Sequence, residues 1–235
     1  AMESRGLGDV YKRQEVLTVA RAAGLGPYPA VVGHSFGGFV ALETGALYGR
    51  ELAGVVLVDF TVAPPERYME WGLRAERENK RPRKTRVYAD REAAVARFRL
   101  LPDQPVAHQC VLDHIADSSL RPVEGGWTWK FDPTLFDHLE MGPDQVDKFC
   151  ALRCRAAVVL GESSDDEGAL NGPYMQEITA GKLPMFSIPG THHHLMFEEP
   201  RALAAAIKGI VWSWIREDGH EEMTASLHRL LGKVE

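Results

Sequence analysis

The segment Val31–Gly38, which reads Val-Val-Gly-His-Ser-Phe-Gly-Gly, constrains the fold of this chain more than any other stretch. Two β-branched residues lead into a Gly-x-Ser-x-Gly turn, and the helix-forming stretch 39–48 follows at once. A strand that reverses into a helix within one or two residues strains its turning residue, and flanking glycines remove the side chains that would collide. The pattern predicts a nucleophile elbow that presents the Ser35 hydroxyl beside the positive end of a helix. The alternative is that this stretch is a glycine-rich loop with no catalytic role.

Four short apolar runs without polar alternation indicate strands that are buried on both faces, as in a parallel sheet. These runs are residues 30–33, 55–60, 156–160 and 185–188. Helical segments are expected at residues 11–23, from Phe36 onward, and at residues 200–215. The sequence therefore predicts an α/β fold with a mostly parallel sheet flanked by helices.

With these features the chain resembles the α/β-hydrolase fold family, and the resemblance extends from about Leu17 to about Ile215. The segment Pro189–Pro200 is similar to the family's histidine loop, which follows the last strand and leads into the final helix. The resemblance implies a triad of serine, acid and histidine in that chain order, with Ser35 as nucleophile and His193 as base. Imidazole suits this role because its unperturbed pKa of roughly 6.5 lies near working pH.

The triad acid has two candidates. The strand 156–160 runs into a loop that is similar to the family's Gly-x-x-Asp turn, but the usual acid position holds Ser164, and Asp165 lies one residue late. Asp59 lies at the end of the strand 55–60, where some family members carry their acid, although an aspartate there is also a common structural cap. We favour Asp165 and keep Asp59 as the alternative. Either acid would fix the histidine tautomer and stabilise the imidazolium.

Three adjacent histidines, residues 192–194, also raise the question of a metal site. Consecutive residues of a strand or helix cannot all point at one ion, and no cysteine or second histidine pair lies at ligand spacing nearby. We therefore expect His192 and His194 to pack in the loop, with no metal and no other cofactor.

The stretch before the elbow departs from the family pattern. Only 34 residues precede Ser35, whereas the family normally places about four strands and a helix there. These include a loop that donates one of the two oxyanion-hole N–H groups, and no such His-Gly loop occurs upstream. The amide of Phe36 is expected as the remaining donor, and losing one donor costs roughly 2.7 to 4 kcal/mol of transition-state stabilisation. We expect a truncated N-terminal half, with a natural minimal hydrolase as the alternative.

Composition limits the possible partners. The chain has 235 residues, 45% of them hydrophobic, which is enough for one core with an insertion. A net charge of -6 argues against nucleic acid as a partner, and no apolar run approaches the roughly 20 residues that span a bilayer. Three cysteines leave an odd count, so a reducing cytoplasm is the default location.

The family resemblance also suggests how the chain divides. Residues 1–60 and 143–235 correspond to the hydrolase core, and residues 61–142 correspond to a cap insertion. Trp127 and Trp129 are candidates for the mouth of an acyl pocket, although packing inside the lid is favoured for such large rings. His34, the neighbour of the nucleophile, is a further candidate for contact with the substrate, although packing beside the elbow is its favoured role.

The predicted function is hydrolysis of a carboxylic ester, or a related acyl bond, of a small to medium apolar molecule through an acyl-enzyme on Ser35. The alternative is a catalytically silent remnant that binds an apolar ligand or associates with itself. In either case a second copy of the chain is a possible partner, because it would cover the sheet edge that a shortened N-terminal half exposes.

Overall fold

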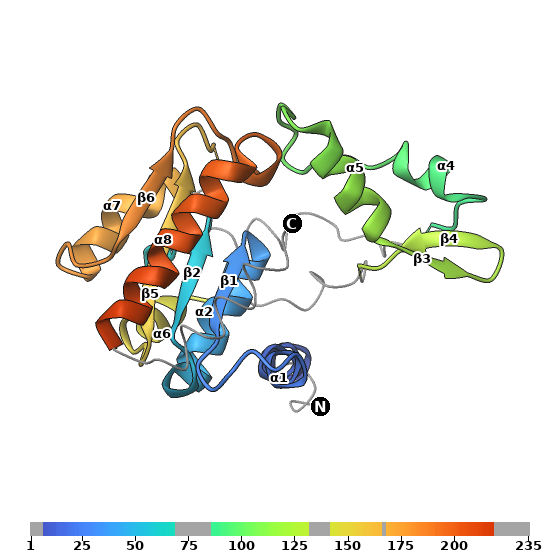
Figure 1. The fold of residues 1–235 in the computed structure, drawn as a ribbon. Coiled ribbons are helices and arrows are strands. Elements are labelled where there is room, and N and C mark those ends of the chain that lie inside the picture. Colours follow the sequence, from blue (N-terminus) through green and yellow to red (C-terminus); the bar gives the residue numbers. More distant parts are fainter. Residues whose placement is uncertain (1–6, 69–85, 132–141, 166–167, 219–235) are drawn as a thin grey trace.

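A computed structural model describes residues 7–68, 86–131, 142–165 and 168–218. Its centre is a sheet of four parallel strands in the order β1-β2-β5-β6 (Figure 1). The strands are β1 (Ala30–His34), β2 (Gly54–Val58), β5 (Arg155–Gly161) and β6 (Met185–Ile188). All three pairings are parallel, with Val31 opposite Val55 and Val55 opposite Ala156. The expected α/β fold with a mostly parallel sheet is confirmed.

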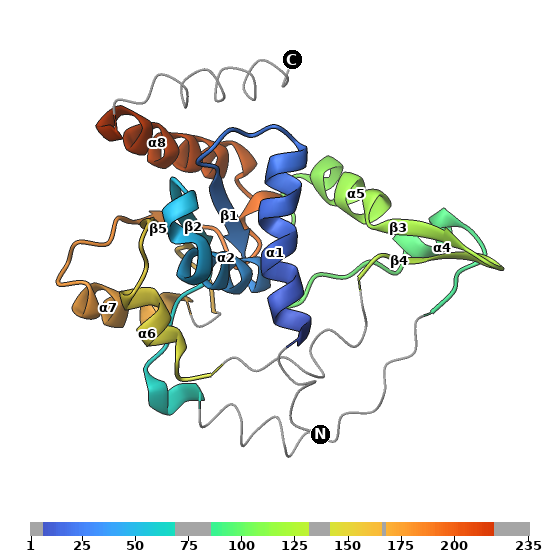
Figure 2. The ribbon, with the colours of Figure 1, turned by 90° about the horizontal axis from the view of Figure 1, so that it is seen from below.

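Helices cover both faces of this sheet because parallel strands require crossovers. The helical elements of the core are α1 (Leu7–Ala22), α2 (Phe36–Tyr48), η1 (Gly49–Glu51), α6 (Gln145–Cys150), α7 (Gly168–Ile178), η2 (Leu195–Phe197) and α8 (Pro200–Asp218). Helices α1, α2, α6 and α7 contribute to the apolar cluster on one face. Helix α8 builds the cluster on the other face, and Figure 2 shows it across the sheet from α2 and α6.

Strand β2 shows why the strand sequences lack alternation. Val55 and Leu57 belong to the cluster under α2, whereas Val56 and Val58 belong to the cluster under α8. All four side chains are at most 1% exposed. Successive residues of a strand point to opposite faces, so a strand that is covered on both sides must be apolar at every position.

Strand β1 stands at one end of the four-strand order, with β2 as its neighbour in the described sheet. The side chain of Val32 in this strand is 43% exposed. An accessible apolar edge strand is a surface on which another chain can pair. Self-association across this edge stays a prediction.

Four elements that lie between β2 and α6 in the chain form a separate group beside the core (Figure 1). They are α4 (Arg91–Val95), α5 (Gln109–Ser118), β3 (Leu120–Val123) and β4 (Gly126–Trp129). The two strands make an antiparallel hairpin, and Asp90 caps α4 by accepting the N–H of Ala93 at 2.7 Å. We call residues 86–131 the cap. Other parts of the predicted insertion 61–142, namely 69–85 and 132–141, lie outside the described residues.

In the described part of the chain, no helix has both the length and the apolar character needed to cross a lipid bilayer.

Helix α8 offers a test of the core packing. The ring of Trp214 is 4% exposed and packs on β2 so closely that a Cβ added at Gly54 would lie 2.5 Å from it. We expect Trp214→Ala to lower the free energy of unfolding by ~3–5 kcal/mol, because a large cavity opens in the core. Trp212→Ala is the matched control, since its ring is 37% exposed, and its cost should be about 1 kcal/mol or less. Urea denaturation measures both values, and equal losses would contradict the assigned packing.

Candidate active site

The polar residues singled out in the sequence follow the carboxyl ends of neighbouring strands. Ser35 comes directly after β1 and Asp59 directly after β2, while Ser164 and His193 lie in the loops after β5 and β6. Because all four strands are parallel, their carboxyl ends lie together along one edge of the sheet, which is not the side edge formed by β1. In open α/β sheets this edge is where ligands bind.

Ser35 has the strained geometry that the elbow pattern predicts. Its φ and ψ angles are 53° and -122°, and α2 begins at the next residue. The turn is so tight that a Cβ at Gly33 would lie 1.9 Å from the carbonyl oxygen of Gly37. The N–H of Ser35 donates to the carbonyl of Val58 at 3.0 Å, which ties the turn to β2. The side chain is thereby held at the end of the sheet and the beginning of a helix.

Three side chains form a hydrogen-bonded chain at this edge. The Oγ of Ser35 lies 2.9 Å from Nε2 of His193, and Nδ1 of His193 lies 2.7 Å from Oδ2 of Asp59. A carboxylate only accepts, so Nδ1 carries the hydrogen and Nε2 is left to accept the Ser35 hydroxyl. The side chains of His193 and Asp59 are 3% and 0% exposed. This arrangement can pass a proton from serine to imidazole while the carboxylate fixes the tautomer.

The carboxylate at His193 belongs to Asp59, and the expectation that favoured Asp165 is corrected here. Asp59 has a φ angle of 45°, a left-handed conformation that aspartate tolerates better than most residues. Its Oδ1 accepts the N–H of Gly161 at 2.9 Å, and its Oδ2 also accepts the hydroxyl of Ser164 at 2.6 Å. Asp165, one residue further along, is exposed.

Ser164 explains why the acid was assigned to the wrong loop. This residue stands where the resemblance places the family's usual acid, yet a hydroxyl cannot fulfil that role and instead donates to Asp59. The signal that would have found Asp59 is the pairing of β2 with β5, which sets Val58 beside Val159 and brings the two strand ends together. Strand pairing is a tertiary contact, and it cannot be read from a single sequence.

The loop that carries His193 crosses the end of β5 at very short range. A Cβ at Gly161 would lie 2.4 Å from the carbonyl oxygen of His192, so only glycine allows this passage. The N–H of Ser163 donates to the carbonyl of Thr191 at 2.8 Å and fastens the two loops to each other. The ring of His192 turns away to Glu198, with Nδ1 2.8 Å from Oε1. Among the three adjacent histidines, His193 alone reaches Asp59 and Ser35.

His34 lies against this loop. Its Nε2 is 2.7 Å from the carbonyl oxygen of His193, and the two ring centroids are 4.8 Å apart. Burial is the main cause that lowers the pKa of His34 to about 4; the hydrogen bond to the His193 carbonyl opposes this shift, and the nearby rings of His193 and His194 contribute to it. The ring is therefore neutral near pH 7 and donates Nε2–H to the carbonyl. This contact agrees with the packing role, while a contact of His34 with substrate stays a prediction.

The rings of Trp127 and Trp129 pack against other side chains of the cap. The guanidinium of Arg91 lies 4.7 Å from the Trp127 ring, and Trp129 packs at 5.6 Å from Phe98 and 6.3 Å from Tyr88. These contacts fit the lid-packing interpretation. A role at the mouth of an acyl pocket stays a prediction.

Phe36 is the first residue of α2 and follows the serine directly. Its ring packs against Phe39 with centroids 5.8 Å apart. Its backbone amide is one of the N–H groups at the beginning of the helix, where the helix dipole favours negative charge. Its role as an oxyanion donor stays a prediction.

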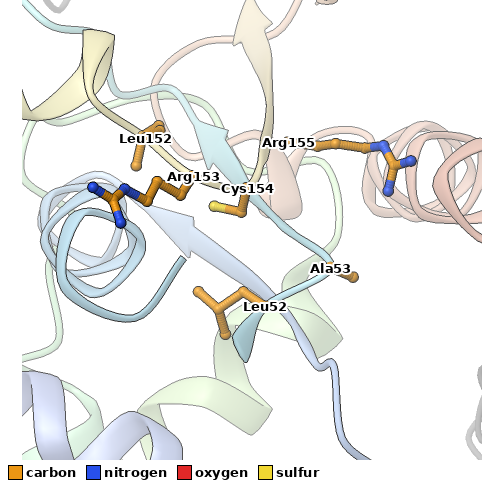
Figure 3. A pocket seen from close by; sticks show the side chains of 6 residues that line it. All are labelled: Leu52, Ala53, Leu152, Arg153, Cys154 and Arg155. Atoms are coloured by element: carbon orange, nitrogen blue, oxygen red, sulfur yellow. The ribbon is translucent and has the colours of Figure 1, made fainter. Parts of the chain in front are cut away.

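A cavity of about 390 Å³ lies at the amino ends of strands β2 and β5, opposite the carboxyl ends that carry Ser35 and Asp59 (Figure 3). Its lining comes from Leu52 and Ala53, which precede β2, and from residues 152–155 at the beginning of β5. Burial raises the pKa of the Cys154 thiol in this cavity to about 11, so the sulfur stays protonated at neutral pH. The cavity therefore lies away from Ser35 and lacks a reactive thiolate at Cys154.

The chain matches the model of the alpha/beta hydrolase family over residues 3–206. The crystal structure of E-2-(acetamidomethylene)succinate hydrolase is similar with a TM-score of 0.64 and 22% identity, covering 84% of this chain and 71% of that one. The thioesterase domain from the curacin biosynthetic pathway has a TM-score of 0.59 and 17% identity, covering 83% and 71%.

A novel esterase from Mycobacterium tuberculosis has a TM-score of 0.56 and 21% identity, covering 85% of this chain and 66% of that one. No protein with a curated description matches the sequence. At these identities the likeness to the solved structures concerns the fold, whereas the family model matches most of the sequence itself. The chain therefore belongs to the alpha/beta hydrolase family.

Proposed function

We propose that this protein is a serine hydrolase that cleaves a carboxylic ester, or a related acyl bond, of a small to medium apolar molecule. The observation that carries the proposal is the hydrogen-bonded chain from Ser35 through His193 to Asp59 at a strained elbow. A serine is a weak nucleophile unless a base takes its proton, and here a base lies 2.9 Å from the hydroxyl.

Acylation begins when Oγ of Ser35 attacks the carbonyl carbon of the substrate. The hydroxyl proton passes to Nε2 of His193, and the carbonyl oxygen becomes an oxyanion in a tetrahedral intermediate. The intermediate collapses when the bond to the leaving alcohol breaks, and the imidazolium returns its proton to that alcohol. The product of this half-reaction is an acyl ester on Ser35.

Deacylation repeats these steps with water as the nucleophile. Nε2 of His193 takes a proton from the water as its oxygen attacks the acyl carbon. The second tetrahedral intermediate then releases the carboxylic acid, and the proton returns to Oγ of Ser35. The enzyme is restored with no net change of charge.

Asp59 holds the imidazole in the tautomer that both half-reactions need. Its carboxylate accepts the Nδ1–H of His193 and faces the positive charge that forms on the ring. The donors Gly161 and Ser164 keep the carboxylate fixed in a site without solvent contact. A fixed charge stabilises the imidazolium without the cost of reorganising its surroundings.

Two further features support acyl transfer. Helix α2 begins directly after Ser35, so a carbonyl attacked by this serine would lie beside the first turn of α2, where we assign the Phe36 amide as oxyanion donor. The similar structures include proteins named as an esterase and as a thioesterase, both of which act on acyl bonds. We assign an ester of a small to medium apolar acid as the substrate class.

Covalent labelling tests the nucleophile. A fluorophosphonate probe should label the wild-type protein at Ser35, because a serine that a base activates attacks the phosphorus, displaces fluoride and forms a stable phosphonate ester. Labelling should vanish in Ser35→Ala and weaken strongly in His193→Ala. Mass spectrometry of the labelled peptide identifies the site, and circular dichroism confirms that each variant is folded. If the folded wild-type protein takes no label, the serine hydrolase proposal is refuted. The alternative that remains is a catalytically silent protein that binds an apolar ligand or associates with itself.

Paired substitutions test the acid. Asp59→Asn should lower kcat on a short-chain ester by roughly 10⁴-fold, because an amide fails to hold the histidine tautomer and the imidazolium. Asp165→Asn is the matched control and should leave kcat close to the wild-type value, since that side chain is exposed. Steady-state kinetics measure both. The assignment fails if Asp165→Asn abolishes turnover and Asp59→Asn does not.

A further inference from the structure

Three imidazole rings meet beside Ser35, although the proposed mechanism uses only one of them as a base. The ring centroids of His34, His193 and His194 are 4.8, 5.2 and 4.8 Å apart. One nitrogen from each ring lies within 4.8 Å of a nitrogen of the other two. We infer that these histidines form an inhibitory site for a divalent transition-metal ion such as Zn²⁺.

The hydrogen bonds of the three rings indicate which nitrogen carries the hydrogen in each neutral imidazole. Nε2 of His34 faces the carbonyl of His193 at 2.7 Å, and Nε2 of His194 faces the carbonyl of Leu101 at 3.1 Å. Nδ1 of His193 faces the carboxylate of Asp59. All three oxygens only accept, so these nitrogens carry hydrogens and the other nitrogen of each neutral ring holds a lone pair.

This pattern is the one that metal-binding histidines show. A histidine ligand almost always donates its second ring N–H to a carboxylate or a backbone carbonyl, which fixes the tautomer and the ring orientation. His193 donates to a carboxylate, whereas His34 and His194 donate to carbonyls. The orienting contacts of a three-histidine metal site are therefore already present.

The separations require a modest adjustment. Zinc binds imidazole nitrogens at about 2.0–2.1 Å, so two ligands of a tetrahedral ion lie about 3.4 Å apart. The widest pair of nitrogens, at up to 4.8 Å, must therefore approach by about 1.4 Å. His193 is buried and held by Asp59, whereas His34 and His194 are only partly buried, so the adjustment falls on these two rings.

Three consecutive residues of a helix or strand cannot converge on one ion, but the three rings of this cluster come from two segments of the chain. The third ligand is not His192, whose ring pairs with Glu198, but His34 from the elbow. His193 and His194 lie in a loop and not in a helix or strand, so neighbouring side chains can converge. A set of three imidazoles suits Zn²⁺, Cu²⁺ or Ni²⁺, and it does not suit Mg²⁺ or Ca²⁺.

Metal binding at this site opposes the reaction. The lone pair on Nε2 of His193 is the one that accepts the Ser35 hydroxyl, so an ion that takes it removes the base from the nucleophile. This inhibitory consequence rests on the proposed function, whereas binding of the ion does not.

Calorimetric titration with ZnCl₂ tests the binding. The protein should carry Cys110→Ser and Cys150→Ser, because both thiols are exposed and would bind zinc themselves. In this background His194→Gln should weaken the Zn²⁺ affinity at least about tenfold, the smallest loss seen when even a supporting residue of a metal site is removed. His192→Gln is the matched control and should leave the affinity unchanged. Equal affinities in the two variants would overturn the site.

Turnover of a short-chain ester tests the inhibition in the same proteins. Zn²⁺ should abolish turnover and EDTA should restore it, while Mg²⁺ at the same concentration has no effect. His194→Gln should retain metal-free turnover and need at least about tenfold more Zn²⁺ for half inhibition. Turnover that persists at saturating Zn²⁺ would overturn the inhibitory role. A wild-type protein with no metal-free turnover would refute the proposed function, and the calorimetric comparison would still decide the site.

Discussion

The buried carboxylate of Asp59 is the contact on which the rest of the site depends. It stands at the end of β2, and it accepts hydrogen bonds from the end of β5, from the loop that follows β5, and from His193 in the loop after β6. A carboxylate away from water is tolerated only when donors satisfy it, so these segments must meet at this point for the chain to fold as it does. The hydrogen bonds that satisfy the buried carboxylate of Asp59 therefore also position the imidazole of His193 beside Ser35.

Much of this fold could be predicted from the sequence because its signals are local. The apolar runs reveal strands that are covered on both faces, and the glycines around Ser35 reveal a turn that few other sequences can make. The acid could not be assigned in the same way. Asp59 and Asp165 both follow apolar strands, and the choice depends on how the loop around Ser164 folds back over Asp59. The cluster of His34, His193 and His194 was missed for a related reason, since it joins residues that are about 160 positions apart.

The histidine loop also joins the cap to the core. The N–H groups of Ala107 and His108 both donate to the carbonyl of Phe197, at 3.0 and 2.9 Å. The side chain of Gln104 accepts the N–H of His194 at 2.7 Å and donates to Glu198 at 3.1 Å. Glu198 in turn receives the N–H of His192 at 2.6 Å. The loop that carries the imidazole is therefore held from the core side by Asp59 and from the cap side by Gln104.

This double attachment limits how the protein can be re-engineered. For an exchange of the whole lid, the natural junctions are the chain just after β2 and just before α6. Such a chimaera would discard the Gln104 amide, whose oxygen accepts the backbone N–H of His194. A transplant that keeps residues 101–108 from the original protein preserves that anchorage together with the Leu101 carbonyl that faces the ring of His194.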